Sequence, residues 1–110
     1  MSNTDIAQKQ LDAYNAQDVD TMMAFYAPDV VVSGLNGAPT ETSRDALHAR
    51  YTKAFAQFPQ NKAELVNRIA VGNTVADHEH VIRAPGGETF DVIAIYTFKD
   101  GLISRVDFAK

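Results

Sequence analysis

The sequence of 110 residues contains no cysteine. This absence excludes a disulfide framework, a thiolate nucleophile and a thiolate metal site, and it is compatible with either redox compartment. Clustered positive charge is also missing, because the ten Lys and Arg are scattered among fourteen Asp and Glu and the net charge is −4. Nucleic acid and anionic membranes are bound through clustered Lys and Arg, so we expect neither as a partner.

Long apolar runs are absent too. No stretch approaches the roughly 20 residues of a membrane span, and the start, MSNTDIAQKQ, lacks the basic and apolar regions of a signal peptide. We therefore expect a cytoplasmic protein. No repeat, low-complexity tract or flexible linker divides the chain, which predicts a single domain over residues 1–110. A domain this small that also encloses a pocket needs further stabilisation, which favours a homodimer.

Helical patterns occupy the first half of the chain. Apolar spacing predicts a helix from Ser2 to about Gln17, and Asp18 is the expected N-cap of a second helix that carries Tyr26 and is stopped by Pro28. The other expected features are a short strand at 30–32, a turn-rich loop at 34–42, and a third helix that Ser43 caps and Pro59 ends.

Strand patterns occupy the second half, where turn signals separate four β-rich segments. The predicted strands are Lys62 to Val71, Thr74 to Ala84, Glu88 to Phe98 and Leu102 to Ala109. Strands that tight turns connect are antiparallel neighbours. Helices followed by such a meander define the α+β class.

Loop lengths predict which side chains share a face of this sheet. A two-residue loop at Gly72 and Asn73 places Arg68 opposite Asp77, and a four-residue loop at 84–87 pairs Arg83 with Glu88. Carboxylates beside aromatic and aliphatic side chains are typical of a pocket lining. The predicted mixed face carries Glu64, Val66, Arg68, Ala70, Val75, Asp77, Glu79, Val81, Arg83, Phe90, Val92, Ala94 and Tyr96.

Three segments resemble a known superfamily: NAQDVDTMMAFYAPDVVV early in the chain, and NRIAVGNTVADHEHV and DVIAIYTFKDGLISRVDF late in it. They are similar to the NTF2-like superfamily, specifically its SnoaL-like and ketosteroid-isomerase-related small proteins. The resemblance implies a cone-shaped, cystatin-like barrel in which three helices pack inside a curved antiparallel sheet. It also implies a homodimer through the outer face of the sheet.

The same resemblance identifies positions where the isomerase residues are replaced. Gln10 stands where the isomerase has its oxyanion tyrosine, Gly34 where it has its base aspartate, and Ala94 where it has its second oxyanion acid. That chemistry needs a carboxylate base and a neutral acid or phenol. These three residues supply neither, so steroid isomerisation is not expected.

Asp77, Glu79 and Arg68 are the candidate catalytic residues. If both carboxylates face a dry cavity, repulsion and desolvation raise the pKa of at least one of them towards neutrality, which is suitable for acid–base catalysis. The competing interpretation is that Arg68 neutralises Asp77 as a cross-strand ion pair and that Glu79 reaches solvent.

Aromatic side chains provide candidate contacts to a ligand. Phe25 and Phe55 are expected in the core, whereas a buried phenol needs a partner for its hydroxyl and so favours a place at a pocket. The candidate ligand-binding residues are Tyr14, Tyr26, Tyr51, Val92, Ala94, Tyr96 and Phe108.

The histidines do not predict a metal site. His78 and His80 face one side of their strand and Glu79 the other, so the three cannot bind one ion. His80 is expected opposite Asp91, either as an interface hydrogen bond or as an oriented base. We expect His48 to face solvent, and we expect neither a metal nor a cofactor.

Two functions remain open. The first is a cofactor-independent isomerase, cyclase or hydratase that acts on a small hydrophobic carbonyl compound, with Asp77 or Glu79 as the base and Arg68 or a tyrosine stabilising the oxyanion. The alternative is a non-catalytic module of the same fold that binds a hydrophobic ligand or serves in dimerisation.

Overall fold

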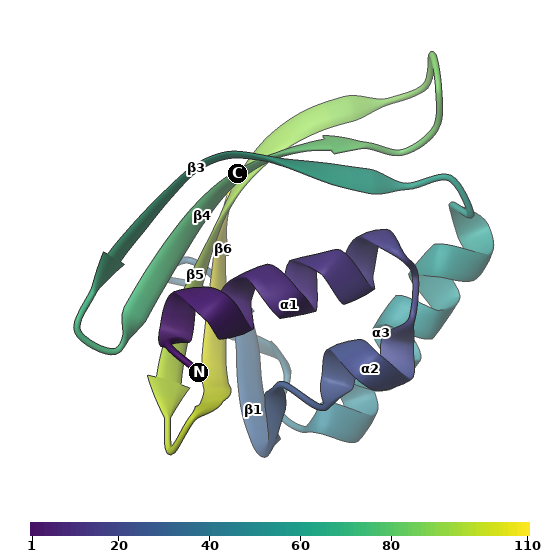
Figure 1. Cartoon of the computed structure of the whole chain (residues 1–110). Coiled ribbons are helices and arrows are strands. Elements are labelled where there is room, and N and C mark those ends of the chain that lie inside the picture. Colours follow the sequence, from purple (N-terminus) through teal and green to yellow (C-terminus); the bar gives the residue numbers. More distant parts are fainter.

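A computed structural model describes all residues, 1–110, and contains three helices and six strands (Figure 1). Their bounds are α1 Asn3–Asn15, α2 Val19–Met23, β1 Tyr26–Gly34, β2 Pro39–Glu41, α3 Arg44–Gln57, β3 Lys62–Val71, β4 Thr74–Ile82, β5 Thr89–Lys99 and β6 Leu102–Ala109. The helices pack on one side of a curved sheet, which confirms the predicted α+β class.

Side chains cap each helix where the sequence predicts a start. The Ser2 hydroxyl accepts a hydrogen bond from the backbone N–H of Asp5 at 3.1 Å, and the Asp5 carboxylate accepts one from the Ser2 N–H, which together form a capping box. The side chains of Asp18 and Ser43 cap α2 and α3 by accepting from the backbone N–H groups of Thr21 and Ala46, without the reciprocal bond. These caps satisfy N–H groups that have no partner within the helix.

The second helix is shorter than the sequence predicts. It ends at Met23, and Tyr26 already begins β1, so the expectation that Tyr26 is helical and that Pro28 stops the helix is wrong. Pro28 lies within β1, where the pairing with β6 is irregular between Tyr26 and Val31. A proline has no N–H for the ladder, and such an irregular stretch does not need one.

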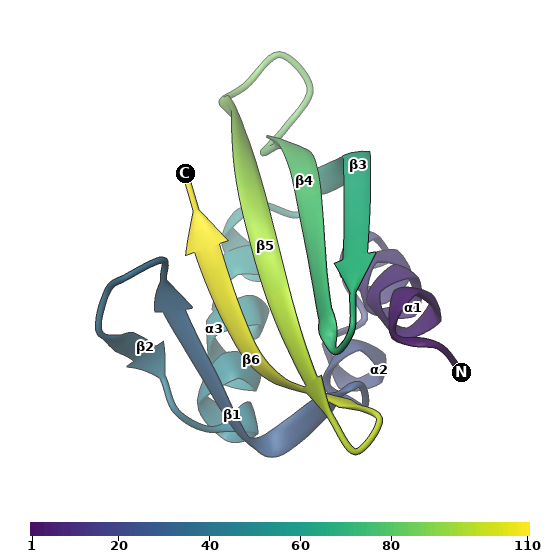
Figure 2. The ribbon, with the colours of Figure 1, turned by 90° about the vertical axis from the view of Figure 1, so that its left-hand side faces the viewer.

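The six strands follow the order β2-β1-β6-β5-β4-β3. Strands β3 to β6 form the predicted antiparallel meander, whereas β1 joins β6 in parallel, so the whole sheet is mixed. β2 lies inside the loop expected at 34–42 and pairs with β1 at one edge. The sheet is open, and Figure 2 shows that no helix covers its convex face.

The predicted register is confirmed between β4 and β5 and along half of β3. Arg68 lies opposite Asp77, and Glu79 lies opposite Val92. A bulge at Val66 then shifts the β3 pairing by one residue, so that Leu65 rather than Glu64 shares the face of Glu79. The expectation that Glu64 belongs to the mixed face is therefore wrong, and its side chain is exposed.

Two groups of buried apolar side chains lie between the helices and the concave face of the sheet. The larger one joins α1, α2, α3 and the sheet, and includes Ile6, Met22, Leu47 and Val75. The smaller one consists of Leu11, Ala63, Val81 and Val92. None of the helices combines the length and the apolar character that crossing a membrane would require.

Candidate functional site

A cavity of about 660 Å³ lies between the two apolar groups, on the concave side of the sheet. Its size falls within the range of small-molecule sites. Gln10, Met22 and Tyr96 line its buried part, whereas Arg50 and Lys110 are more exposed. The complete lining is Gln10, Leu11, Tyr14, Met22, Ser33, Gly34, Leu35, Thr40, Arg50, Tyr51, Ala54, Phe55, Glu79, Arg83, Phe90, Val92, Tyr96, Phe108, Ala109 and Lys110.

Glu79 is the only carboxylate side chain in this lining. The residue is 7% exposed, and its Oε2 atom is buried without a hydrogen-bond partner. Burial and, to a smaller extent, the negative charge of Asp77 raise the pKa of Glu79 to about 7, although Arg68 opposes the rise. Glu79 therefore populates both its protonated and its ionised form near neutral pH.

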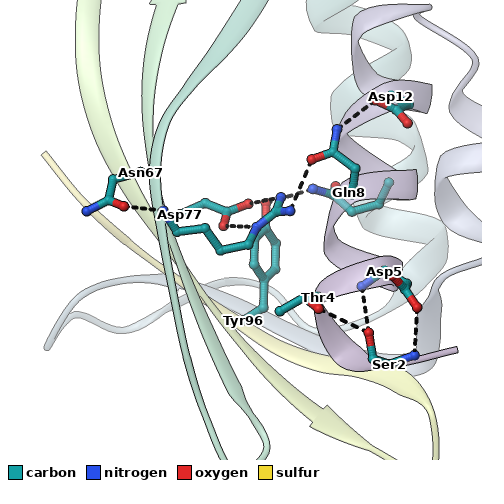
Figure 3. Close-up of polar contacts among 10 residues, drawn as sticks. Ser2, Thr4, Asp5, Gln8, Asp12, Asn67, Asp77 and Tyr96 are labelled. Carbon is teal, nitrogen blue, oxygen red and sulfur yellow. Dashed lines mark hydrogen bonds and ion pairs between the residues drawn. The ribbon is translucent and has the colours of Figure 1, made fainter.

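Asp77 is held differently, although it lies on the same face of β4. Its fully buried carboxylate accepts two hydrogen bonds from Arg68, at 2.7 Å from Nε and 3.0 Å from Nη2. Arg68 also donates to Gln8 Oε1 at 3.0 Å, and the amide of Gln8 donates to Asp12. Figure 3 shows Asp77 pointing from the sheet towards Gln8 on α1. This bidentate pair neutralises Asp77 outside the cavity lining.

Gln10 connects two tyrosines at the buried end of the cavity. The Tyr26 hydroxyl donates to Gln10 Oε1, and Gln10 Nε2 donates to the Tyr96 oxygen, both at 2.9 Å. Burial raises the pKa of Tyr96, and the charge of Glu79 raises it further, so the phenol keeps its proton. Because the Tyr96 oxygen accepts from Gln10, its own O–H remains available as a donor.

Tyr14 is a second phenol with an available O–H. Its oxygen accepts a hydrogen bond from Asn61 Nδ2 at 2.6 Å, and Asn61 Oδ1 in turn accepts one from Arg83 Nη1. Burial raises the pKa of Tyr14, which keeps this phenol protonated as well. The ring packs edge-on against Tyr51 and Phe55, which together form an aromatic wall between α1 and α3.

The predicted ligand contacts divide into two groups. Tyr14, Tyr51, Val92, Tyr96 and Phe108 line the cavity. Tyr26 and Ala94 are buried behind it, at 1% and 0% exposure. Of the predicted catalytic residues Glu79 lines the cavity, whereas Arg68 and Asp77 pair outside it.

Sequence reasoning did not select Arg83, Arg50, Lys110 or Asn61 for the site. A signal existed for Arg83, because it shares the predicted face of Glu79 at four residues' distance. Asn61 follows α3 in a segment without periodicity, and Lys110 follows the last strand, so no pattern could place them. Their position depends on how α3 and the sheet meet.

The histidines lie outside the cavity lining. His78 Nε2 and His80 Nδ1 are hydrogen-bonded to the two oxygens of Asp91, at 2.6 and 2.7 Å, on the convex face of the sheet. These bonds lower the pKa of the exposed Asp91 carboxyl. His48 is bonded to Asp20 at 2.7 Å and is partly exposed. No group of three or more His, Asp or Glu side chains is arranged to hold a metal ion.

These contacts give the cavity one titratable carboxyl and three phenols, those of Tyr14, Tyr51 and Tyr96, in a largely apolar setting. A carboxyl whose pKa is near neutrality can accept or donate a proton, and a protonated phenol can stabilise a developing oxyanion by hydrogen bonding. Gly34 also lines the cavity but contributes no acid or base. The chemistry available therefore centres on Glu79.

Comparisons with known proteins identify the family. The chain is 37% identical to a cystatin-fold protein of Novosphingobium aromaticivorans, with a TM-score of 0.94 over 100% of this chain and 99% of that one. It is 25% identical to a candidate polyketide cyclase of Sinorhizobium meliloti, with a TM-score of 0.81 over 98% and 99%. A candidate ketosteroid isomerase of Kribbella flavida is 20% identical, with a TM-score of 0.83 over 97% and 76%. No functionally curated protein matches the sequence. The family model described as the SnoaL-like domain matches residues 7–106, and the chain belongs to this family.

Proposed function

We propose that the protein binds a small apolar carbonyl compound in this cavity and that Glu79 moves a proton on it. The observation that carries the proposal is the Glu79 carboxyl, which is buried in the cavity wall, unpartnered at Oε2 and has a pKa of about 7. A buried carboxyl without a hydrogen-bond partner destabilises the folded state, and such groups are typical of functional sites.

The first step of the proposed reaction is proton abstraction next to the carbonyl group. The C–H bond breaks, its proton passes to a carboxylate oxygen of Glu79, and its electron pair moves onto the carbonyl oxygen as an enolate. Tyr14 or Tyr96 donates its free O–H to that oxygen. In a β,γ-unsaturated carbonyl compound, return of the proton from Glu79 to the γ carbon gives isomerisation. In a compound with a second carbonyl group, the enolate carbon attacks that carbonyl carbon, the C=O electron pair moves onto its oxygen, and this alkoxide takes the proton from Glu79, which gives cyclisation. The hydratase alternative shares this proton transfer.

Residue and family observations both support this class of reaction. The lining is largely apolar, which suits a hydrophobic substrate. The Sinorhizobium relative, which covers nearly the whole chain, is a candidate polyketide cyclase, and cyclisation begins with such an enolate. Asp77 is a weaker candidate for the base because Arg68 already neutralises it.

Proton exchange provides a test that does not require the natural substrate. Indanone, tetralone and ketones that carry a carboxylate are incubated with the protein in heavy water, and NMR follows loss of the α-proton. We expect exchange that rises as pH increases through about 7, because the ionised form of Glu79 is the base. Glu79→Gln should abolish it, and Glu64→Gln, at an exposed position of β3, should not.

Two results would contradict the catalytic proposal. Exchange by Glu79→Gln at the rate of the unmodified protein would exclude Glu79 as the base. Ligand binding without exchange by any ketone would favour the alternative function, a module that only binds hydrophobic ligands.

We also propose that the protein is a cytoplasmic homodimer, in which a second copy covers the convex face of the sheet. Three apolar side chains on this face, Ile69, Val71 and Ile93, are 62%, 75% and 42% exposed. A symmetric interface brings copies of the same patch together. Ile69→Glu should therefore yield monomers in analytical ultracentrifugation, and Lys53→Glu, on α3, should not. A protein that is monomeric without any substitution would refute the dimer.

A further inference from the structure

The charge of the cavity is opposite to that of the whole protein. The chain carries a net charge of −4, yet Arg50, Arg83 and Lys110 line the cavity, where Glu79 is the only carboxylate side chain, and of the three cations only Arg50 is hydrogen-bonded to a carboxylate, that of Glu41. Cationic side chains around a partly enclosed site raise the local concentration of anions. The lining therefore favours a negatively charged ligand over a neutral one.

Arg83 is the cation that is best prepared to bind such a ligand. Its guanidinium lies 4.8 Å from the ring centroids of both Phe58 and Phe90, and its Nη1 donates to Asn61 Oδ1 at 2.9 Å. These contacts hold the guanidinium plane in one orientation. Its Nε is buried and has no hydrogen-bond partner. A buried N–H without an acceptor costs free energy, which an incoming carboxylate would recover.

Three of the other four arginines, Arg50, Arg68 and Arg105, have a carboxylate within hydrogen-bond distance, and the fourth, Arg44, donates to the backbone carbonyl of Tyr26. Arg50 pairs with Glu41 at 2.7 Å, and Arg105 pairs with Asp107 at 2.9 Å. For Arg83 the nearest carboxylate, the largely exposed Glu88, lies 4.0 Å from Nε, which is too far for a hydrogen bond. The edge formed by Nε and Nη2 is therefore free, and this edge is a geometry that binds carboxylates with two parallel hydrogen bonds.

A second cation adjoins the same aromatic ring. Lys110 Nζ lies 4.5 Å from the Phe90 centroid and forms no ion pair. Arg83 and Lys110 thus concentrate positive charge around Phe90, at one end of the cavity.

The spacing between Glu79 and Arg83 sets the size of the ligand. The two residues are four positions apart along β4 and its extension, on one face, so their Cα atoms are separated by about 13 Å. Val81 lies between them and is buried. Since both side chains extend into the cavity, an apolar body of one or two rings, or a short chain, fits between their charged ends.

We propose that the substrate is an apolar carbonyl compound that also carries a carboxylate, and that Arg83 binds this carboxylate while Glu79 faces the reacting carbon. The inference rests on the proposed function for its reacting end. The part of the inference that concerns the carboxylate rests only on the Nε–Nη2 edge of Arg83, which has no acceptor. Binding of the carboxylate and proton transfer can therefore be tested separately.

Calorimetry with matched acids and esters tests the binding of the carboxylate. The probes are benzoylpropionate, benzoylbutyrate and benzoylvalerate, each compared with its methyl ester, at low salt and neutral pH. We expect each acid to bind at least tenfold more tightly than its ester, with the largest preference for the longest acid, because a charge-assisted pair contributes a factor of this order. Equal binding of acid and ester, or no binding of any acid, overturns the proposal.

Variants test whether Arg83 is the residue that binds the carboxylate. Arg83→Gln should remove the preference for acids, Arg83→Lys should keep part of it, and Lys53→Gln, an exposed charge on α3, should leave it unchanged. Glu88→Gln should strengthen acid binding because it removes the nearest competing carboxylate. If Arg83→Gln does not fold, Arg83→Lys and Glu88→Gln still test whether Arg83 binds the carboxylate. If neither substitution changes the preference for acids over esters, Arg83 is not the binding residue.

The two proposals fail in different ways. Acid-selective binding without proton exchange would refute the catalytic role of Glu79 and leave carboxylate binding by Arg83 intact. Proton exchange on ketones without any preference for acids would refute carboxylate binding by Arg83 and leave the catalytic role of Glu79 intact.

Discussion

Glu79 should make the stability of this protein depend on pH in an unusual direction. Its pKa rises from 4.5 in the unfolded chain to about 7 in the folded protein, and each pH unit corresponds to about 1.4 kcal/mol. Between these two values the folded state binds a proton that the unfolded state has lost. The contribution of Glu79 to stability is therefore greatest below pH 4.5, and it falls by about 3 kcal/mol in total as pH rises through 7.

Glu79→Gln isolates this contribution because the amide has a similar shape and never ionises. We expect the variant to gain about 2.5 kcal/mol relative to the unmodified protein between pH 5 and pH 8.5. Ionisable groups distant from Glu79 titrate alike in both proteins, so their effects cancel in the difference. Asp77 and Arg68 interact with the Glu79 charge, so any response of this pair to its loss is part of the measured difference.

Urea denaturation at several pH values measures this difference. Glu64→Gln is the matched control, since this exposed carboxyl on β3 should show no such change with pH. A difference between Glu79→Gln and the unmodified protein that stays constant from pH 5 to pH 8.5, or that moves in favour of the carboxyl, would refute the reasoning.

Three substitutions test the structural contacts around the cavity, each by urea denaturation. Arg68→Met should destabilise the protein by about 3 kcal/mol because Asp77 is left buried without its partner. Adding Asp77→Leu to this variant should restore much of the lost stability. An Arg68→Met variant as stable as the unmodified protein would contradict this reasoning. Gln10→Leu should cost about 2 kcal/mol, since it removes the acceptor of the buried Tyr26 hydroxyl. Ser43→Ala should cost about 1 kcal/mol by uncapping α3, and Ser43→Asp should cost much less.

Local signals predict most of the elements. Ser2, Asp18 and Ser43 mark helix starts because an N-cap depends only on its own side chain and the next three residues. The two hairpin loops are also local signals: the length of a tight turn fixes which residues pair on either side of it, and this sets the register of β3 with β4 next to the turn and of β4 with β5. At Asp100 and Gly101 both φ angles are positive, as a type I′ turn requires.

Errors occur where distant contacts decide the conformation. The helical pattern extends through Tyr26, but pairing of Tyr26 with Ile103 of β6 draws this residue into a strand. The bulge at Val66 has no signal in the alternation of β3, and it exchanges Glu64 for Leu65 on the concave face. Strand pairing across the chain overrides local propensity in both cases.

The sequence by itself determines the class of the fold, the helix caps, the hairpin register and the shared face of Asp77 and Glu79. It cannot distinguish the roles of these two carboxylates, because the alternation of side chains along β4 places both on the same face. Only the tertiary structure brings Gln8 of α1 to Arg68 and closes the pair with Asp77, while Glu79 is left without a partner in the cavity wall. A pKa depends on burial and on neighbouring charges, and packing between distant segments sets both.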